Sequence, residues 1–536
     1  MKKLLYKLLI LSLSVGAVSC EKLESVNTDP NNPASVPSNM IMAGTEKKIM
    51  DYVYDNWFSG RQSLVYSQYW CQRNYTEEDR YQIRESVNNS YFNQLYTCLA
   101  NLETVIKLNS DPETAVKMAV YGNNDNQIAA AKILKTWLYQ VMTDTWGSIP
   151  YSEASRLDEG IYYPKYDDQA EIYKALIQDL TDAVAMIDVK ETAFNGGDRI
   201  FNGDASKWKK FANSLKCRLA IHVSKVDPNW KTYIAQALAS GVFESNKDNA
   251  VYAYSSTAPE QCHFYRGYFE DKRNDFTISK PFTDILKGQA DTLNLKSHPW
   301  EGVQDPRLPI YTTARNGQYI GMPFGIPSNT IKSDMRNTAP TWYSTTNHPL
   351  CLNADFSVPL MTYAELQFIL SEYNGFSATE YKAGVRASIE YWSGLKGSTV
   401  NETTLNSYIA AVSKTVNSET VALQKYIDLY MNGTEAWVEY RRTGYPTQLL
   451  KPGEVSYFYI DVDEDGVKTP VTLNFTTLSD TKGEIISRVK YPTNESTLNK
   501  NSFDAAVAKL QDGSNNYYSK MFWDVRTSTN QHPANK

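Results

Sequence analysis

The sequence is poor in cysteine and, beyond its first twenty residues, has no long hydrophobic run. Its six cysteines stand at positions 20, 71, 98, 217, 262 and 351, and no two of them have CxxC spacing. This pattern excludes a disulfide framework and a typical zinc site. A membrane-spanning helix needs about 20 consecutive apolar residues. No segment after residue 20 meets that length, so the rest of the chain is predicted to lie in water.

The chain also lacks an excess of basic residues and the motifs of common enzymes. Its net charge of -6 leaves no basic stripe for the phosphates of nucleic acid, which is therefore not an expected partner. No GxSxG, HExxH or glycine-rich phosphate loop occurs, and the histidines are scattered. A glycoside hydrolase needs only two carboxylates, and Glu77, Glu78 and Asp79 are examples of many. We predict no enzymatic activity and no required cofactor, with a glycoside hydrolase as an alternative.

The first twenty residues have the pattern of a secretion signal. Lysines at positions 2, 3 and 7 precede an apolar run over residues 8–18, which is about half the length that spans a bilayer. Ser19 stands directly before Cys20, an arrangement that a bacterial lipoprotein signal peptidase accepts. Residues 1–19 are therefore predicted to be a lipoprotein signal peptide, and Cys20 the lipidated first residue of the mature protein. The alternative is an ordinary signal peptide with an incidental cysteine.

Most of the mature chain repeats its apolar residues at helical spacing. From Ala130 to Val141, for example, they fall at i, i+3, i+4, i+7, i+8 and i+11. Similar patterns fill much of residues 44–245 and 360–443. The helices come in pairs that short turns separate, and no pair can bury its apolar face alone. This arrangement indicates stacked helix hairpins of the tetratricopeptide kind.

Three further segments lack this periodicity. Residues 20–43, rich in Asn, Pro and Ser, are predicted to form an extended tether after the lipidated cysteine. Residues 246–359 and 444–492 are predicted to be loop-rich insertions with short strands that face a ligand or partner. The predicted fold is mainly α: a tetratricopeptide-like helix-hairpin superhelix with irregular loop-rich insertions and a few short strands. It is expected to form a single domain over residues 44–536.

The aromatic content is dominated by tyrosine, since 38 Tyr outnumber 18 Phe and 11 Trp together. Sugars bind where exposed rings stand beside directional polar groups, because their CH faces stack and their hydroxyls need partners. Two loop segments have this composition, QYWCQRNY at residues 68–75 and the central insertion. The candidate ligand-binding residues are Tyr69, Trp70, Arg73, Tyr75, Trp300, Tyr319, Trp342 and Tyr343. The alternative for each ring is that it packs a loop onto a helix.

The acidic segment DVDEDGVKT at residues 461–469 has part of the pattern of a calcium loop. Asp461, Asp463, Asp465 and Gly466 match the first, third, fifth and sixth positions of such a loop, where alternate carboxylates converge on Ca²⁺. The twelfth position is Thr472 instead of a bidentate Glu. Calcium is one interpretation. The other is a hairpin between the strand-like segments SYFYI and VTLNF, with Asp and Gly as turn residues.

Residues 129–154, AAAKILKTWLYQVMTDTWGSIPYSEA, resemble a characteristic stretch of the SusD/RagB family of outer-membrane nutrient-binding lipoproteins of Bacteroidetes, in its SusD-like branch. Further segments agree in order along nearly the whole mature chain: NTDPNNP near its start, EAWVEYRRTGYP at 435–446, RVKYPTNESTLN at 488–499 and KMFWD at 520–524. The resemblance implies a tetratricopeptide-like helical body that is lipid-anchored on the outer leaflet of the outer membrane. It also implies that the protein forms a lid on a SusC-like, TonB-dependent β-barrel transporter. In that role the lid protein binds oligosaccharides or other nutrients for import.

The motif residues also have structural interpretations. Gly147 permits a tight turn after a helix, Pro150 prevents the helix from continuing, and Trp146 offers a large face that fixes the turn. Arg441 and Arg442 are interpreted as cations at a helix end, where the helix dipole favours them. These residues are therefore predicted to define the fold and not to contact a ligand.

The prediction is a surface-exposed, lipid-anchored outer-membrane lipoprotein that captures a nutrient, most often a glycan in the family it resembles, and delivers it to a SusC-like TonB-dependent barrel. One alternative is a structural or adhesion lipoprotein of the same fold without a small-molecule ligand. The other is a glycoside hydrolase on a helical scaffold, which would need two carboxylates about 5 to 10 Å apart in a cleft.

Overall fold

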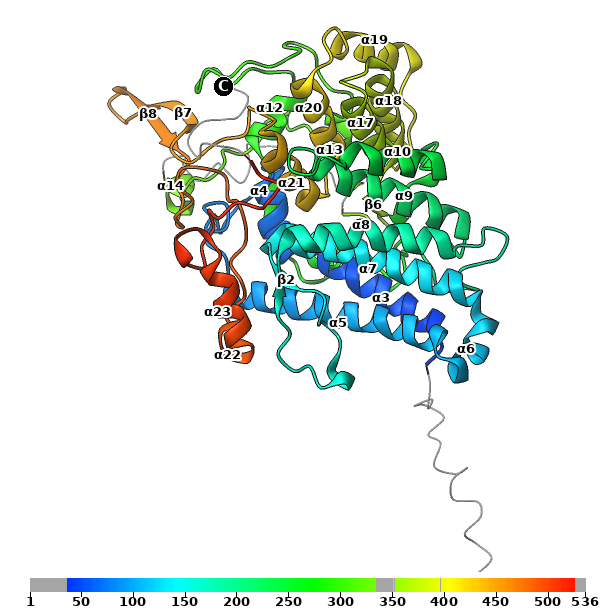
Figure 1. Ribbon diagram of the computed structural model, residues 1–536. Helices are drawn as coiled ribbons and strands as arrows, with labels where there is room; N and C mark the ends of the chain where they lie inside the picture. Colours follow the sequence, from blue (N-terminus) through cyan, green and yellow to red (C-terminus); the bar gives the residue numbers. More distant parts are fainter. Residues whose placement is uncertain (1–35, 334–349, 351, 396, 526–536) are drawn as a thin grey trace, which may run out of the picture.

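The computed structural model describes residues 36–333, 350, 352–395 and 397–525, and in this part the chain is mainly helical (Figure 1). The predicted fold class, a mainly α chain with a few short strands, is confirmed. Cys20, Trp342 and Tyr343 lie outside the described residues. Within the described ranges no helix has the length and hydrophobicity that crossing a membrane requires.

The structural elements follow one another from a helical first half through a loop-rich middle to a second helical group. The α-helices are α3 (Ser38–Val53), α4 (Leu64–Tyr66), α5 (Glu85–Ser110), α6 (Pro112–Met118), α7 (Asn124–Trp146), α8 (Gln169–Met186), α9 (Ala205–His222), α10 (Trp230–Ser240), α11 (His263–Tyr265), α12 (Lys280–Leu286), α13 (Leu308–Tyr311), α14 (Ser328–Ser333), α17 (Tyr363–Tyr373), α18 (Ala378–Leu395), α19 (Glu402–Val412), α20 (Ser418–Asp428), α21 (Gly433–Thr443), α22 (Glu495–Leu498) and α23 (Lys500–Ala508). The π and 3₁₀ turns are η1 (Ser59–Ser63), η2 (Ala119–Tyr121), η3 (Leu157–Glu159), η4 (Asn246–Asp248), η5 (Arg266–Glu270) and η6 (Gln511–Gly513). The strands are β1 (Trp70–Gln72), β2 (Ile149–Pro150), β3 (Tyr166–Asp167), β4 (Ala250–Tyr252), β5 (Phe276–Ile278), β6 (Val358–Met361), β7 (Val455–Val462) and β8 (Lys468–Asn474).

The long helices stack in chain order. Helix α3 packs on α5, α5 on α7, α7 on α8, α8 on α9 and α9 on α10. In the second group α17 packs on both α18 and α20, and α20 on α21. The two groups meet where α17 contacts α9 and where α21 contacts α7. Figure 1 shows the first group in blue to green at the lower right and the second in yellow and gold above it.

Helix α7 is the centre of the stack, because it contacts α3, α5, α8, α9 and α21 and is buried along nearly its whole length. It ends at Gly147, whose φ of 89° lies in the left-handed region that favours glycine. The Thr143 hydroxyl donates to the Gly147 carbonyl at 2.7 Å, and the Trp146 indole N–H donates to Asn88 Oδ1 at 3.0 Å. Pro150 then enters β2. The structural interpretation of this motif is confirmed.

The strands form four separate two-stranded sheets, β1 with β5, β2 with β3, β4 with β6, and β7 with β8, within the described part of the chain. All four are antiparallel. The β1–β5 sheet joins the loop-rich middle of the chain to the segment after α4, and the β4–β6 sheet pairs the two ends of that middle with each other. The β7–β8 hairpin instead projects from the body at the upper left of Figure 1.

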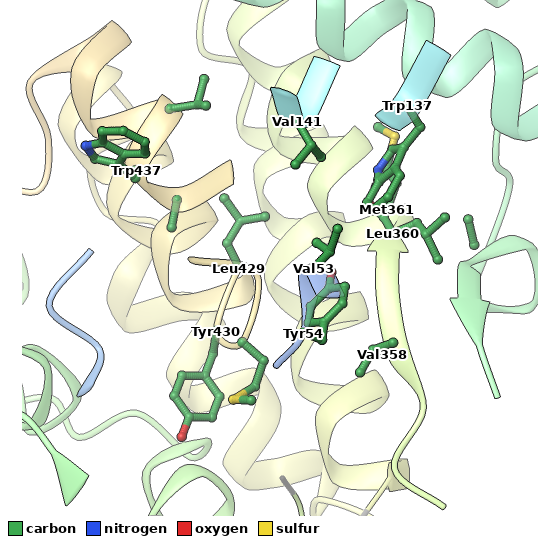
Figure 2. Close-up of a cluster of buried hydrophobic side chains, with 14 of the residues drawn as sticks. Val53, Tyr54, Trp137, Val141, Val358, Leu360, Met361, Leu429, Tyr430 and Trp437 are labelled. Carbon is green, nitrogen blue, oxygen red and sulfur yellow. The ribbon is translucent and has the colours of Figure 1, made fainter. Parts of the chain in front are cut away.

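An apolar cluster joins the two helical groups (Figure 2). Its labelled members come from α3 and the residue that follows it, α7, β6, the turn before α21, and α21: Val53, Tyr54, Trp137, Val141, Val358, Leu360, Met361, Leu429, Tyr430 and Trp437. The Trp137 indole also donates to the Leu360 carbonyl at 3.3 Å, which satisfies its polar atom. The burial of so many large side chains from both groups makes one continuous core.

A buried ionic network lies beside this apolar cluster. The Arg218 guanidinium on α9 donates twice to Glu365 on α17, at 2.7 and 2.6 Å. It also donates to Gln140 Oε1 on α7 at 3.3 Å and lies 3.8 Å from Glu435 on α21. Burial raises the pKa of the Glu365 carboxyl, and Arg218 lowers it in opposition. A cation removed from water is compensated here by groups from three other helices.

His222, one turn beyond Arg218 on α9, extends the network. Its Nε2 lies 2.8 Å from Glu435 Oε1, and its Nδ1 lies 3.0 Å from the Tyr173 hydroxyl. That hydroxyl in turn donates to Asp144 Oδ1 at 2.6 Å. Both imidazole nitrogens therefore have polar neighbours, although the side chain is fully buried.

Arg441 and Arg442 lie in the last turn of α21, as predicted. Both are buried, and their main partners are hydrogen-bond acceptors on other segments and not the helix dipole. Arg442 donates to both oxygens of Glu372 at 2.7 Å and to Glu439 at 2.8 Å. Arg441 donates to the carbonyls of Asp144 and Ser487 at 2.9 Å each. These arginines cross-link helices, a role that their position near a helix end does not reveal.

We expect Arg218→Met to lower the free energy of unfolding by about 3–5 kcal/mol, because it leaves Glu365 buried without its cation. Arg386→Met is the matched control, because Arg386 pairs with Glu390 and Glu402 at the surface, where such pairs contribute less than about 1 kcal/mol. Urea unfolding at neutral pH measures both changes. Equal small effects of the two substitutions would contradict the structural role of the buried pair.

Candidate functional site

A pocket of about 800 Å³ opens between α12, the loops around residues 287–302 and 319–321, and strand β7; we call it the loop pocket. Two tyrosines, Tyr319 and Tyr457, supply its aromatic surface. Asp284, Gln289 and Asp291 are among its polar lining residues. Its size lies within the range of roughly 300–1,000 Å³ that is usual for small-molecule sites.

The walls of the loop pocket are fixed by close backbone packing. The segment around Gly321 lies against the start of α12, where Lys280 N donates to Met322 O at 2.7 Å and Met322 N donates to Ile278 O at 3.0 Å. A Cβ at Gly321 would lie 2.3 Å from the Ser279 carbonyl, so only glycine permits this approach. Tyr319, two residues earlier, is thereby held at the edge of the pocket.

The second tyrosine is positioned by the base of the β7–β8 hairpin. The Asn294 side chain accepts from Val455 N and donates to Val455 O, both at 2.9 Å, which fastens β7 to the loop beside the pocket. Asp291 fixes that loop in turn, because its carboxylate accepts from Leu293 N at 3.1 Å and from Asn294 Nδ2 at 2.7 Å. The pocket is therefore built on hydrogen-bonded loops and a strand.

Charged residues of both signs line the loop pocket, Lys280 and Lys287 with Asp284, Asp291 and Glu301. Lys280 and Asp284 form an ion pair, so part of the charge is compensated within the wall. Burial raises the pKa of the Asp284 carboxyl, and Lys280 opposes that shift. Burial also raises the pKa of the Tyr319 and Tyr457 hydroxyls, which stay neutral hydrogen-bonding groups at physiological pH. Rings beside carboxylate and amide oxygens provide stacking faces and acceptors for sugar hydroxyls.

The structure corrects the prediction for Tyr69 and Trp70, which have 0% and 1% exposure. Trp70 lies in β1, stacks on Phe276 with ring centroids 5.3 Å apart, and donates its indole N–H to the Tyr430 hydroxyl at 3.0 Å. Tyr69 stacks on Tyr426 at 4.6 Å. Both rings are part of the core, so neither presents a face to a ligand.

Trp300 is also a core residue, with 5% exposure and its ring edge-on to His298 at 5.1 Å. Among the candidates that the structure describes, Tyr319 lies in the loop pocket. Tyr75 is 54% exposed and Arg73 half-buried, but neither belongs to the lining of that pocket.

Sequence reasoning missed Tyr457, Asp284 and Gln289, which the fold brings to the same pocket as Tyr319. Tyr457 had a detectable signal, because it stands in the strand-like segment SYFYI. Asp284 and Gln289 had none, since they look like ordinary surface polar residues in a loop-rich stretch. Two exposed rings outside the pocket, Trp57 and Phe269, were also not singled out.

The acidic segment after β7 is a hairpin turn. Asp463 Oδ1 accepts from Asp465 N at 3.0 Å and from Val467 N at 2.8 Å. Gly466 has a φ of 79°, as such a turn requires. The hairpin interpretation is confirmed, and calcium at Asp461, Asp463 and Asp465 stays a prediction.

Among the described residues, three potential metal ligands come together elsewhere, at His222, Glu435 and Glu439, within 4.8 Å of one another. Glu439 lies 3.0 Å from Lys425 and 2.8 Å from Arg442. Burial raises the pKa of the Glu439 carboxyl, but these two cations outweigh burial and lower it to about 2. Lys425 and Arg442 already supply the positive charge that a metal ion would bring to this cluster. The cluster is therefore an ion-pair network.

A stack of helix hairpins that carries a loop-walled pocket defines a class of ligand-binding proteins with a tetratricopeptide-like body. The family model described as "Starch-binding associating with outer membrane", SusD-like, matches residues 30–456. The chain therefore belongs to the SusD-like family, and the resemblance drawn from the sequence motifs is confirmed. Among curated protein sequences none matches it.

Solved structures share this fold at low sequence identity. A SusD homolog from Parabacteroides distasonis superposes with a TM-score of 0.72 at 19% identity, over 91% of this chain and 98% of that one. A chitin-binding SusD homolog from Flavobacterium johnsoniae gives a TM-score of 0.68 at 22% identity, over 91% of this chain and 100% of that one. A structure described as a chitin-binding protein gives 0.68 at 24% identity, over 90% and 100%.

We expect Trp70→Ala to destabilise the protein by about 3–5 kcal/mol, since it removes a buried ring and its hydrogen bond to Tyr430. Tyr75→Ala, a substitution of an exposed ring five residues away, is expected to change stability by less than about 0.5 kcal/mol. Chemical unfolding of both variants measures the difference. A Trp70→Ala variant of unchanged stability would show that this ring is not part of the core.

Proposed function

We propose that this protein is a lipid-anchored, surface-exposed outer-membrane lipoprotein that captures a glycan in the loop pocket and delivers it to a SusC-like, TonB-dependent transporter. The observation that carries the glycan assignment is that Tyr319 and Tyr457 line the same pocket, of about 800 Å³, as hydrogen-bond acceptors such as Asp284 and Gln289. Family membership supports it, because the family model carries the description "Starch-binding associating with outer membrane". The lipid anchor at Cys20 and the transporter come from the sequence pattern and the family resemblance.

The rival functions fit the pocket less well. A purely structural or adhesion lipoprotein does not require a fixed pocket that is lined by both aromatic rings and hydrogen-bond acceptors. A glycoside hydrolase would need an acid and a second carboxylate in one cleft. Three carboxylates line the pocket, Asp284, Asp291 and Glu301. Asp284 is engaged by Lys280 and Asp291 by the turn that it stabilises, which leaves Glu301 as a single carboxylate where a hydrolase needs two. We therefore assign binding without catalysis.

We expect Tyr319→Ala and Tyr457→Ala each to weaken glycan binding about tenfold, because each removes a stacking face, and the double variant to abolish it. Isothermal titration calorimetry with maltoheptaose and chitopentaose measures the change, and urea unfolding confirms that each variant is folded. Tyr75→Ala is the control, an exposed ring outside the pocket, and its affinity is expected to equal that of the wild type. Weaker binding in Tyr75→Ala with unchanged binding in Tyr319→Ala would move the site to the early segment.

A further inference from the structure

A second pocket, of about 440 Å³, lies between α5, the loop that joins β2 to β3, and α22; we call it the helix–loop pocket. Figure 1 shows α5, α22 and this loop at the bottom of the molecule, whereas α12 of the loop pocket lies near the top. The linings of the two pockets have no residue in common. No part of the proposed function makes use of the second pocket.

One wall of the helix–loop pocket is an uncovered face of α5. Asn93, Tyr96, Thr97 and Ala100 line it at the i, i+3, i+4 and i+7 spacing of a single helical face. The Tyr96 ring is fixed, since its hydroxyl donates to the Pro150 carbonyl at 2.7 Å and its ring lies 4.8 Å from that of Phe92. This wall therefore offers a rigid aromatic face beside an amide.

The opposite wall is the β2–β3 loop, which places large apolar side chains in water. Leu157 is 66% exposed and Tyr162 is 69% exposed, and both line the pocket. An exposed tyrosine or leucine is common alone, but here both line the same pocket as the uncovered face of α5.

The loop is held in its conformation by specific bonds. The Asp167 carboxylate accepts from Tyr151 N at 3.1 Å and from Ser152 N at 2.8 Å, and Glu153 accepts from Lys165 N at 2.9 Å. Ser155, which lines the pocket, has a φ of 59°, a conformation that costs energy for a residue other than glycine and is concentrated at functional sites. The wall is thus preorganised although it is exposed.

The helix–loop pocket also has hydrogen-bonding groups, with Glu153, Arg156 and Glu495 in its lining. Arg156 is paired with Glu159, which compensates its charge within the loop. Glu495 lines the pocket from α22, and the Tyr166 hydroxyl donates to its Oε2 at 2.9 Å. Burial raises the pKa of the Glu495 carboxyl. A carboxyl oxygen beside aromatic faces offers an acceptor for hydroxyl groups next to a stacking surface.

We propose that the helix–loop pocket is a second carbohydrate-binding site, which takes a short neutral saccharide independently of the loop pocket. The sugar ring would stack between Tyr96 and Tyr162, and its hydroxyls would bond to Asn93 and Glu495. The volume of about 440 Å³ accommodates a short oligosaccharide. With two separate sites, the protein would hold one polysaccharide chain at two places or two fragments at once.

The test uses the full mature protein with the loop pocket disabled by Tyr319→Ala and Tyr457→Ala. Maltose, cellobiose, xylobiose and chitobiose are titrated into it by isothermal titration calorimetry at millimolar concentration. In this background, Tyr162→Ala is expected to weaken the residual binding about tenfold, through loss of one stacking face. Ala100→Trp, which fills the pocket from an exposed helical position, is expected to abolish it. Tyr163→Ala is the matched control, because Tyr163 is 72% exposed in the same loop but does not line the pocket.

The outcomes separate this inference from the proposed function. Residual binding that Ala100→Trp removes and Tyr163→Ala leaves unchanged supports the second site. Residual binding that persists unchanged in both Ala100→Trp and Tyr162→Ala overturns it, as does the absence of binding by all four disaccharides. If the loop-pocket substitutions leave wild-type binding intact while Ala100→Trp abolishes it, the second site stands and the proposed use of the loop pocket fails.

Discussion

The buried pairing of Arg218 with Glu365 is the interaction on which the rest of the structure depends. Arg218 belongs to the first helical group and Glu365 to the second, and the same guanidinium reaches Gln140 on α7 and lies close to Glu435 on α21. A charge removed from water costs several kcal/mol unless its partners are well placed. The network therefore permits one relative arrangement of the two groups. The loop-rich segment between them, which carries the loop pocket, is fixed at both ends by that arrangement.

The ion pairs and the apolar cluster have complementary tasks. Packing of Trp137, Tyr54 and Leu360 supplies the burial that stabilises the body, but apolar surfaces tolerate sliding. The hydrogen-bonded charges specify the register of the helices, since a small shift would leave a buried group unpaired. In Glu435 burial raises the pKa, yet His222 and Arg218 outweigh it and hold the pKa well below its usual range. A rigid body of this kind lets exposed loops differ widely in sequence while their ends stay in place.

Local features of the structure were predictable from the sequence, and features that depend on distant packing were not. The helical period of α7 and the Gly147 turn are local, so the sequence indicated both. The turn chemistry of residues 461–466 likewise identified the β7–β8 hairpin as one alternative. Trp70 was assigned wrongly because the rings that bury it, Phe264, Phe276 and Tyr430, come from far along the chain. For the loop pocket the sequence indicated Tyr319 and the two loop-rich insertions, but not how they combine, since α12, Tyr319 and Tyr457 meet only in the folded chain.

Delivery of a captured glycan requires a transporter in the membrane. The presence of that partner is therefore the most direct test of the proposed function. The measurement is purification of the tagged full-length protein from outer membranes in mild detergent, with identification of co-purifying proteins by mass spectrometry. We expect a TonB-dependent β-barrel in stoichiometric amount, which is lost together with outer-membrane association in Cys20→Ala. A protein that is present in the outer membrane but reproducibly alone would contradict the account and favour a structural or adhesive role.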